Sequence, residues 1–343
     1  LGGPGLGPLR DRRDVVEVLD RPRLAADDAL LRDVFGLLIH AHYRTRPLDL
    51  RNLLDGPNLQ VVVLRQGGAL CGVALIAAEG GFSAAVATAI WAGQRRPRGH
   101  LLSQSLASHV GVVEGASITA LRVMRIAVHP HRQGRGLGTH LLAHLDQMAR
   151  DEGAGVLGAS FGATPALLRF WTAAGFQALH LGMRRDGASG THSVVMVRAL
   201  APPGERVVTV ARERMARDFP SQLADPLAHL EPQVARMLLL DLDMPQPHAQ
   251  DWQDAVGFAH GHRAFEVSLA ALCRIALVAL CNKMDGDAEL TEAECNALVA
   301  RVVQGRAWAE AAALSGEAGR PGLVRCLRAA LARLVATNGP LEA

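Results

Sequence analysis

The spacing of apolar residues changes near residue 201. Before that point it predicts helices over 30–43, 136–151 and 167–174. Runs rich in β-branched residues predict a hairpin with arms at 61–64 and 69–77, strands at 118–128 and 155–161, and a final strand pair at 176–183 and 192–200. Beyond residue 201 almost every segment has helical spacing, so the pattern predicts an α/β domain with a central sheet flanked by helices, followed by a mostly helical domain.

The length of the chain supports this division, since 343 residues correspond to roughly two domains at about 150 residues each. We expect a first domain over 28–202 and a helical tail over 203–343, joined at the Ala-Pro-Pro-Gly of 201–204. The chain opens with Leu1 and continues with Gly and Pro. We therefore interpret residues 1–27 as a linker or the remnant of an upstream module.

The positive charge of the chain comes almost entirely from arginine. Lys and Arg number 36 against 33 Asp and Glu, and this net charge of +3 does not by itself indicate nucleic-acid binding. Lys283 is the single lysine, and no glycine-rich stretch leads up to it. A P-loop needs Gly-Lys followed by Ser or Thr, so we expect this chain to bind neither ATP nor GTP.

The cysteines favour a reducing compartment, and we expect a cytoplasmic protein. They are odd in number, scattered and without a C-x-x-C pair, which argues against a disulfide framework or a zinc site; they are Cys71, Cys273, Cys281, Cys295 and Cys326. The longest apolar run, at 267–281, is interrupted by Arg274 and is too short to cross a bilayer. We expect a buried helix there and no membrane association.

The acidic stretch at 285–289 has some of the character of a calcium-binding loop. Such a loop needs Gly at its sixth position and Glu at its twelfth, where this chain has Leu290 and Asn296. Thr291 and Glu294 instead form the pattern of a capping box that opens a helix. We therefore expect no metal.

The most specific chemical signal is the glycine-rich segment that joins the strand at 118–128 to the helix at 136–151. Gly134, Gly136 and Gly138 allow the backbone to approach a diphosphate, and free N–H groups at the start of a helix point toward it. Arg132 and Arg135 add charged donors. A dinucleotide-binding interpretation fails on glycine spacing and on the missing acidic residue downstream.

The order Gln-x-x-Gly-x-Gly after an Arg-Ile-Ala-Val strand resembles the acetyl-CoA loop of the GNAT superfamily of N-acetyltransferases. The segment 155–161 and the Phe-Trp-Thr-Ala-Ala-Gly-Phe at 170–176 resemble later elements of that fold. The resemblance implies that acetyl-CoA binds to the strand through Ile126, Ala127 and Val128, and to the loop through Gln133, Gly134, Arg135, Gly136, Leu137, Gly138 and Thr139.

One position departs from the superfamily. Many members have a tyrosine that protonates the departing thiolate, and Trp171 stands there in this chain. The alternatives for Trp171 are packing in the core or a reaction without that general acid. The second is chemically acceptable, because the thiolate of coenzyme A is a good leaving group.

Further segments resemble the bacterial tRNA(Met) cytidine acetyltransferase family from about residue 28 to 200, and more weakly to the C-terminus. They are His-Tyr-Arg-Thr-Arg-Pro-Leu-Asp-Leu-Arg at 42–51, Ile-Trp-Ala-Gly-Gln-Arg-Arg-Pro-Arg-Gly at 90–99, Ser-Phe-Gly at 160–162, Arg-Phe-Trp at 169–171 and Ala-Ser-Gly at 188–190. The resemblance implies acetylation of N4 of the wobble cytidine of elongator tRNA(Met).

That family also uses ATP or GTP hydrolysed by an upstream helicase-like module. The absence of a P-loop implies that such a module is missing from this chain, which then is a portion of a longer protein, works without it, or takes a separate protein as partner. The family's Gly-Glu pair is Pro165-Ala166 here, so one carboxylate contact to the cofactor is missing.

The amine of cytosine is a poor nucleophile, and its acetylation needs a fixed geometry and a proton acceptor. His129, after the strand at 118–128, and His192, in the last loop, are the candidates for this base. The alternative for His129 is a residue that bonds the loop backbone. The alternative for His192 is an exposed loop residue.

Arginine clusters are the candidates for RNA contact, with Tyr43 and Trp91 as stacking platforms. The arginines are Arg44, Arg46, Arg51, Arg95, Arg96, Arg98, Arg184 and Arg185. The helical tail is expected to bind tRNA by resemblance. The alternatives are solvated charged faces for the clusters and a plain packing domain for the tail. At the level of function, the alternatives are an N-acetyltransferase for a protein or small amine, and a non-catalytic RNA-binding remnant.

Overall fold

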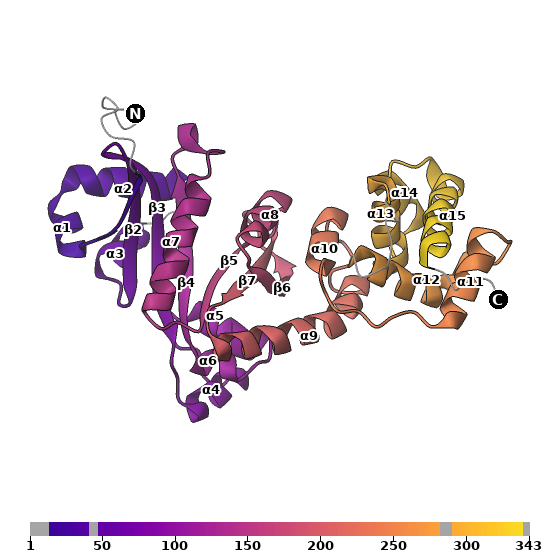
Figure 1. Ribbon diagram of the computed structural model, residues 1–343, viewed down its shortest axis with the longest axis horizontal. Helices are drawn as coiled ribbons and strands as arrows, with labels where there is room; N and C mark the ends of the chain where they lie inside the picture. Colours follow the sequence, from indigo (N-terminus) through magenta and orange to yellow (C-terminus); the bar gives the residue numbers. More distant parts are fainter. Residues whose placement is uncertain (1–13, 41–46, 282–289, 339–343) are drawn as a thin grey trace. The chain divides into compact units, whose positions relative to one another are not determined.

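The computed structural model describes residues 14–40, 47–281 and 290–338. The chain divides into two compact units, with the boundary between Ala211 and Arg212. The first unit is built on a seven-stranded sheet of order β1-β2-β3-β4-β5-β7-β6 (Figure 1). The strands are β1 (Asp14–Leu19), β2 (Leu59–Gln66), β3 (Ala69–Gly80), β4 (Thr119–Val128), β5 (Val156–Gly162), β6 (Gln177–Arg185) and β7 (His192–Ala199). The predicted hairpin, strands and strand pair are confirmed.

Strand pairing is antiparallel throughout the sheet except between β4 and β5, which run parallel. The β2–β3 hairpin closes through Gly67 and Gly68, whose positive φ angles of 59° and 81° suit the tight turns that join twisted strands. A parallel pair needs a crossover, and α7 (Leu137–Asp151) supplies it between β4 and β5. The sheet is therefore mixed, as the resemblance to the GNAT fold implies.

Helices cover both faces of the sheet. One face carries α1 (Arg21–Ala26), α2 (Asp28–His40) and α3 (Pro47–Asp55), whose Leu24, Val34 and Leu53 form a core with Val61 and Val73 of the strands. The other face carries α7 and α8 (Pro165–Ala173), with Trp171 stacked on Phe161 at 5.5 Å between ring centroids. The helix predicted over 30–43 is confirmed up to His40, beyond which its residues are outside the described part.

The interpretation of residues 1–27 as a linker or remnant is wrong for 14–27. Residues Asp14–Leu19 form β1, an edge strand paired with β2 from Asp14↔Gln66 to Leu19↔Val61. The next residues form α1, where Leu24 is fully buried. The first unit thus begins at or before residue 14.

A helical insertion separates β3 from β4. It consists of α4 (Ala84–Trp91), α5 (Leu101–Gln104), a π-helical turn η1 (Ser105–His109) and α6 (Glu114–Ser117). Leu102 and Leu106 of this insertion share a core cluster with Val156 and Val195 of the sheet and with Val207 from the first turns of α9 (Pro202–Ala224). The boundary between the compact units, after Ala211, therefore lies a few residues beyond the boundary expected after residue 202, because the first turns of α9 pack on the sheet.

The second unit is helical, as predicted for the tail. It contains the later turns of α9 and α10 (Pro232–Leu239), α11 (Ala249–Ala259), α12 (Phe265–Leu280), α13 (Glu292–Ala297), a π-helical segment η3 (Leu298–Val303), α14 (Trp308–Leu314) and α15 (Gly319–Asn338). The apolar run at 267–281 lies mostly in α12, whose Leu272 and Ile275 are fully buried, so the buried helix is confirmed. The Thr291–Glu294 capping box is present in both directions.

Other predictions from composition concern disulfides, membranes and metals. All five cysteines lie in described segments, and none of them forms a disulfide. None of the described helices has the length and apolar character needed to cross a membrane. The described residues contain no group of three or more His, Cys, Asp or Glu side chains that could hold a metal ion.

Candidate active site

Strands β4 and β5 separate halfway along their length. Their parallel pairing runs from Ala120↔Val156 to Val123↔Ala159 and ends there. Beyond this point β4 continues to Val128, still paired with β3, while β5 continues toward Gly162, still paired with β7. A register shift in the β3–β4 ladder, where Leu75 pairs with Arg125 and Ile76 with Val123, leaves Met124 as an extra residue at the point of separation.

The separation exposes backbone donors and acceptors along one edge of β4. The N–H of His129 donates to the carbonyl of Cys71 on β3, at 2.8 Å. Because both backbone groups of a residue point to the same side and alternate along a strand, Ala127 also directs its groups toward β3. Ile126 and Val128 direct theirs to the opposite edge, where β5 has moved away. Of the three residues expected to contact the pantetheine arm, Ile126 and Val128 direct backbone groups to the open edge and Ala127 does not, although the carbonyl of Val128 also accepts a hydrogen bond from Gln133.

The glycine-rich loop lies where β4 ends. A side chain placed on Gly134 or Gly136 would meet no atom within 4 Å, and both residues have positive φ angles of 72° and 78°. Gly136 is the N-cap of α7, and the first amide in the helical pattern is that of His140, which donates to the carbonyl of Gly136. The N–H groups of residues 136–139 therefore have no acceptor within the helix. They border an open space suited to an anion.

The other loop residues have structural roles that keep this geometry. Gln133 donates its side-chain amide to the carbonyl of Val128, at 3.1 Å. Leu137 is 6% exposed and anchors the first turn of α7 in the core. A Cβ on Gly138 would lie 3.3 Å from the ring of Phe170, so glycine allows α7 and α8 to approach here. Arg132 donates to Gln66 at 2.7 Å, while Arg135 and Thr139 are exposed beside the open space.

His129 braces the loop. Its Nδ1 accepts a hydrogen bond from the N–H of His131 at 3.3 Å and caps the short helix η2 (Pro130–Arg132). This is the alternative that the sequence left open for His129, and the geometry favours it over a role as base.

His192 is 7% exposed and begins β7, so its interpretation as an exposed loop residue is wrong. Its Nδ1 lies 2.7 Å from the carbonyl oxygen of Gly182 on β6. A carbonyl only accepts, so Nδ1 carries the proton and Nε2 of the neutral ring has a free lone pair. The β6–β7 ladder is irregular here, between Leu181 and Arg185, which gives the ring its space. The next residue, Ser193, pairs with Gly162 at the open end of β5.

Trp171 is a core residue. It is 3% exposed, stacks on Phe161, and meets Phe176 edge to face at 4.7 Å. The first of the two alternatives drawn from the sequence is confirmed, since the indole is enclosed by aromatic rings.

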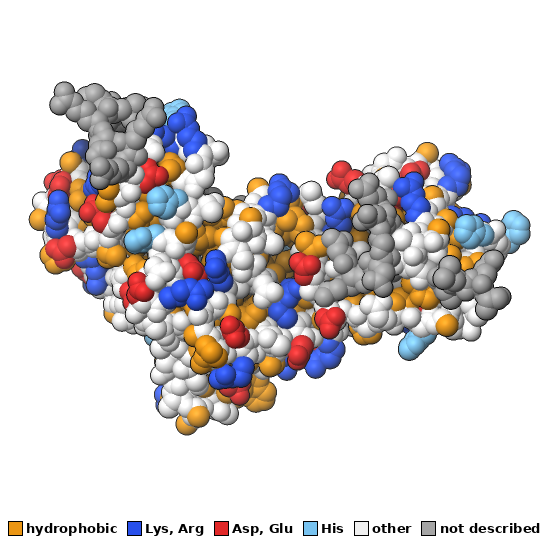
Figure 2. Space-filling view, viewed as in Figure 1, with side chains coloured by type: hydrophobic (Ala, Val, Ile, Leu, Met, Phe, Trp, Pro, Cys, Tyr) orange, Lys and Arg blue, Asp and Glu red, His pale blue; other side chains and the backbone are white. Residues whose placement is uncertain are grey.

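The predicted RNA-contact arginines lie on separate elements. Arg51 on α3 is exposed and lies 3.8 Å from Asp55, Arg95, Arg96 and Arg98 are exposed between α4 and α5, and Arg184 and Arg185 are exposed at the end of β6. Arg44, Arg46 and Tyr43 lie outside the described residues. On the face seen in Figure 2, basic and acidic side chains alternate over both units, so local clusters matter more than the net charge.

Comparison with known proteins places both units in families. Residues 33–156 and 139–201 match the family GNAT acetyltransferase 2, and residues 204–339 match the tRNA-binding domain family. The chain therefore belongs to the GNAT acetyltransferases in its first part, and its second part is similar to the tRNA-binding domain family.

Several curated proteins are similar to this chain over most of its length, across both family matches. The chain is 46% identical over 93% of its length to the tRNA(Met) cytidine acetyltransferase TmcA of Nitrosococcus halophilus (strain Nc4), of which it covers 43%. It is 36% identical over 71% of its length to TmcA of Pectobacterium atrosepticum, of which it covers 35%, and 38% identical over 83% to TmcA of Haloferax volcanii, of which it covers 38%. The chain thus spans less than half the length of the curated relatives that it matches.

Proposed function

We propose that this protein transfers an acetyl group from acetyl-CoA to N4 of a cytidine in tRNA, with the wobble cytidine of elongator tRNA(Met) as the target. The observation that carries the proposal is the open edge of β4, which leads into the glycine-rich loop at Gly134 and Gly136. The same chain matches the tRNA-binding domain family at 204–339. Relatives similar over most of the chain bear the name tRNA(Met) cytidine acetyltransferase. The division into an acetyltransferase domain and a tRNA-binding tail belongs to this proposal.

The residues present fit acetyl-CoA. The space beside Gly134 and Gly136, which a Cβ would partly fill, and the N–H groups of residues 136–139 suit the diphosphate. The outward backbone groups of Ile126 and Val128 suit the amides of the pantetheine arm, because they offer the donors and acceptors of a missing strand. Pro165 and Ala166 begin α8 behind the N-cap Thr164, so no carboxylate is available at the family's Gly-Glu position and the backbone carries the binding.

Bound acetyl-CoA supplies an acetyl group that is already activated as a thioester. The chain must then hold the cytosine amine against the carbonyl carbon and accept the proton that N4 loses as the C–N bond forms, while the C–S bond breaks and coenzyme A leaves as its thiolate. His192 suits the second task through Nε2, because Gly182 fixes the proton on Nδ1. Ile126 and Val128 hold the donor in place, and a fixed position supplies much of the rate for such a reaction.

The test is mass spectrometry of tRNA(Met) incubated with this protein and acetyl-CoA, with and without ATP. We expect one acetyl group on cytidine, and we expect the variant Gly136→Glu to produce none. Acetylation in the absence of ATP would show that no separate ATPase partner is needed. Acetylation of a protein or small amine in the absence of tRNA would replace the proposed substrate. Failure of acetyl-CoA to raise the melting temperature of the protein would overturn the proposal that it is an acetyl-CoA-dependent enzyme. The expected place of action is the cytoplasm, where tRNA and free thiols coexist.

A further inference from the structure

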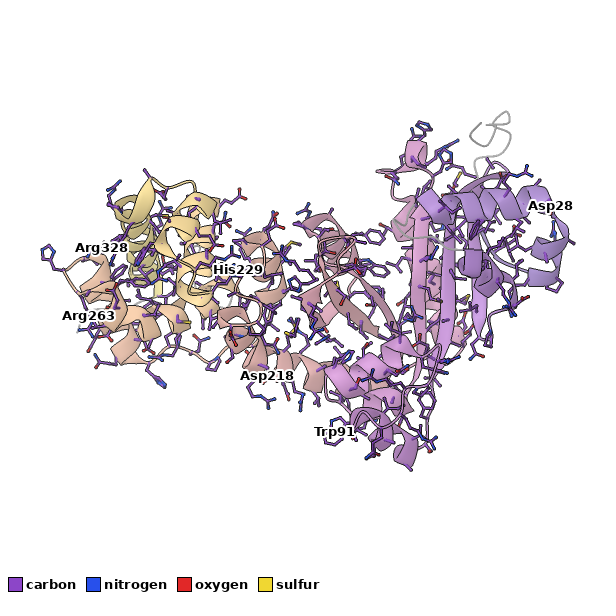
Figure 3. All side chains as sticks on the ribbon, turned by 180° about the vertical axis from the view of Figure 1, so that it is seen from behind. Asp28, Trp91, Asp218, His229, Arg263 and Arg328 are labelled. Carbon is purple, nitrogen blue, oxygen red and sulfur yellow. The ribbon has the colours of Figure 1, made fainter. Side chains whose placement is uncertain are left out.

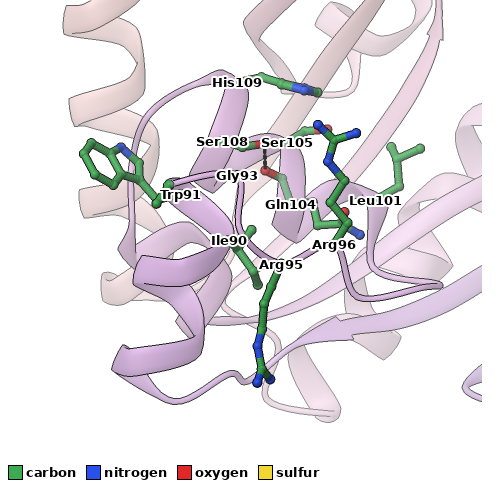
Figure 4. A pocket seen from close by; sticks show the side chains of 11 residues that line it. Ile90, Trp91, Gly93, Arg95, Arg96, Leu101, Gln104, Ser105, Ser108 and His109 are labelled. Atoms are coloured by element: carbon green, nitrogen blue, oxygen red, sulfur yellow. Dashed lines mark hydrogen bonds between the residues drawn. The ribbon is translucent and has the colours of Figure 1, made fainter.

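A cavity of about 470 Å³ lies in the helical insertion between β3 and β4. Its walls are the end of α4, the loop that follows it, α5 and the π-helical turn η1 (Figure 4). Its volume is within the range of sites that hold one small ligand. The insertion that holds the cavity precedes β4 in the chain, whereas the glycine-rich loop follows that strand. At about 3.3 Å per residue, the ten residues of β4 span roughly 30 Å.

The cavity has the charge of an anion site. Arg95, Arg96 and His109 line it, and its lining within the described part of the chain includes no carboxylate. Other arginines of this unit are engaged, as Arg122 is with Glu79 and Arg150 with Asp146. Among the described residues, neither Arg95 nor Arg96 has a carboxylate partner. Their charges are thus available to a phosphate.

The loop that carries these arginines is held firmly. The backbone N–H groups of Gln94 and Arg95 both donate to the carbonyl of Ala89, at 2.9 and 3.1 Å. The side-chain amide of Gln104 donates to the carbonyls of Pro97 and His100. The Nδ1 of His100 accepts from the N–H of Gly80 at 3.1 Å. A braced loop loses little conformational entropy when a ligand binds.

An exposed aromatic side chain stands at the rim. Trp91 is 50% exposed at the end of α4 (Figure 3), and in the close view its ring points away from the other labelled side chains (Figure 4). In the close view, Arg95 and Arg96 extend in opposite directions (Figure 4). Two guanidinium groups that diverge suit successive phosphates on either side of one nucleotide better than the clustered phosphates of a free nucleotide. An indole beside them offers a stacking surface for a base.

We propose that this cavity binds one unpaired nucleotide of the RNA substrate, separate from the cytidine that reacts. Arg95 and Arg96 bind the flanking phosphates, and Trp91 stacks on a base. The site rests on the proposed function, and it would place the loop of the RNA so that its cytidine reaches the separated strands. The preferred ligand is single-stranded, because bases within a duplex present no face for stacking.

The experiment measures binding of a tRNA(Met) anticodon stem-loop and of a blunt RNA duplex by fluorescence anisotropy over a range of salt. The variants are Trp91→Ala, Trp91→Phe and the double variant Arg95→Ala/Arg96→Ala. Arg32→Ala, an exposed arginine on α2, is the matched control. Cytidine monophosphate is the competitor that represents a free nucleotide. Acetyl-CoA affinity is measured for every variant and is expected to stay unchanged.

We expect Trp91→Ala to weaken stem-loop binding by about 5- to 100-fold, and Trp91→Phe to retain most of the affinity. The arginine double variant should lower the slope of log affinity against log salt by about 1.4, since each phosphate contact to a single strand contributes about 0.7. Wild-type affinities and slopes in all variants, with tRNA acetylation intact, would overturn the nucleotide site alone. Equal affinity for cytidine monophosphate, or for duplex, would also overturn it. A wild-type protein that binds no tRNA would overturn this site together with the proposed function.

Discussion

Glu79 on β3 and Arg122 on β4 form a buried ion pair, with Arg122 Nε donating to Glu79 Oε1 at 2.5 Å. The other oxygen, Oε2, accepts hydrogen bonds from the backbone N–H groups of Leu102 and Ser103 at 2.7 and 3.3 Å. One carboxylate therefore neutralises a nearly buried guanidinium and caps the start of α5. Through this residue the helical insertion, with its arginine loop, is fixed to the centre of the sheet.

Replacement of Glu79 by alanine should lower the free energy of unfolding of the first unit by about 3–5 kcal/mol, because it leaves Arg122 buried without a partner. Glu17→Ala is the control, since Glu17 and Arg65 form a more exposed pair worth about 1 kcal/mol at most. Amide hydrogen exchange in β3 and β4 is the measurement, as it reports on this unit alone. Equal protection in both variants would contradict the role given to Glu79.

Gly136→Glu should reduce acetyl-CoA affinity by more than about 100-fold, because a carboxylate at the start of α7 repels the diphosphate. Gly153→Glu is a matched control. Gly153 follows the other end of α7, has a φ of 72°, and would also meet no atom within 4 Å of an added Cβ. Backbone strain is therefore similar in the two variants. Isothermal titration calorimetry that gives equal affinities for both would refute the assignment of the loop.

The sequence predicts the regular part of the first unit well. The hairpin at Gly67-Gly68, the strand before the glycine loop and the helix after it each have a local signal. β1 was missed because Asp14–Leu19 is an edge strand, with Val15 and Val18 about half exposed. Its polar and apolar residues do not alternate cleanly. Only its pairing with β2 makes it a strand, and such pairing is set by distant residues.

The sequence predicts which residues belong to the candidate site, but not which way their backbone groups and side chains point. Glycine spacing points to the anion cradle, while the separation of β4 from β5 after Val123 depends on a ladder register that no short motif specifies. The hydrogen bond from the N–H of His129 to the carbonyl of Cys71 shows that the backbone groups of Ala127 face β3. The burial of His192 also depends on elements distant in the sequence, and the cavity beside Trp91 depends on how the segment 90–109 folds on itself. A loop motif thus identifies the cofactor site, and the tertiary structure is needed for the acceptor side.

The stability of the first unit should fall in mild acid because of His180. Burial, and then the neighbouring His109, lower the pKa of His180 from 6.5 to about 4. The unfolded chain therefore takes up a proton at this site before the folded one does. Above pH 6.5 the site costs nothing, and between pH 6.5 and about 4 it lowers the free energy of unfolding by up to about 3 kcal/mol. His180→Gln should remove this part of the pH dependence, measured as the melting temperature at pH 7 and pH 5. An unchanged difference between the two pH values would show that His180 does not titrate in this way.

His192→Asn should abolish most acetyl transfer while leaving the fold and acetyl-CoA binding intact. The Asn amide can donate to Gly182 as Nδ1 does, but it has no group in the place of Nε2. Loss of a general base typically lowers kcat by about 100- to 10,000-fold. The loss should fall on kcat while KM for tRNA stays unchanged, which a purely structural role would not cause. His131→Asn, at an exposed position in η2, is the control for the substitution itself. If His192→Asn keeps kcat, the proton acceptor is another group and His192 serves only to join β6 to β7.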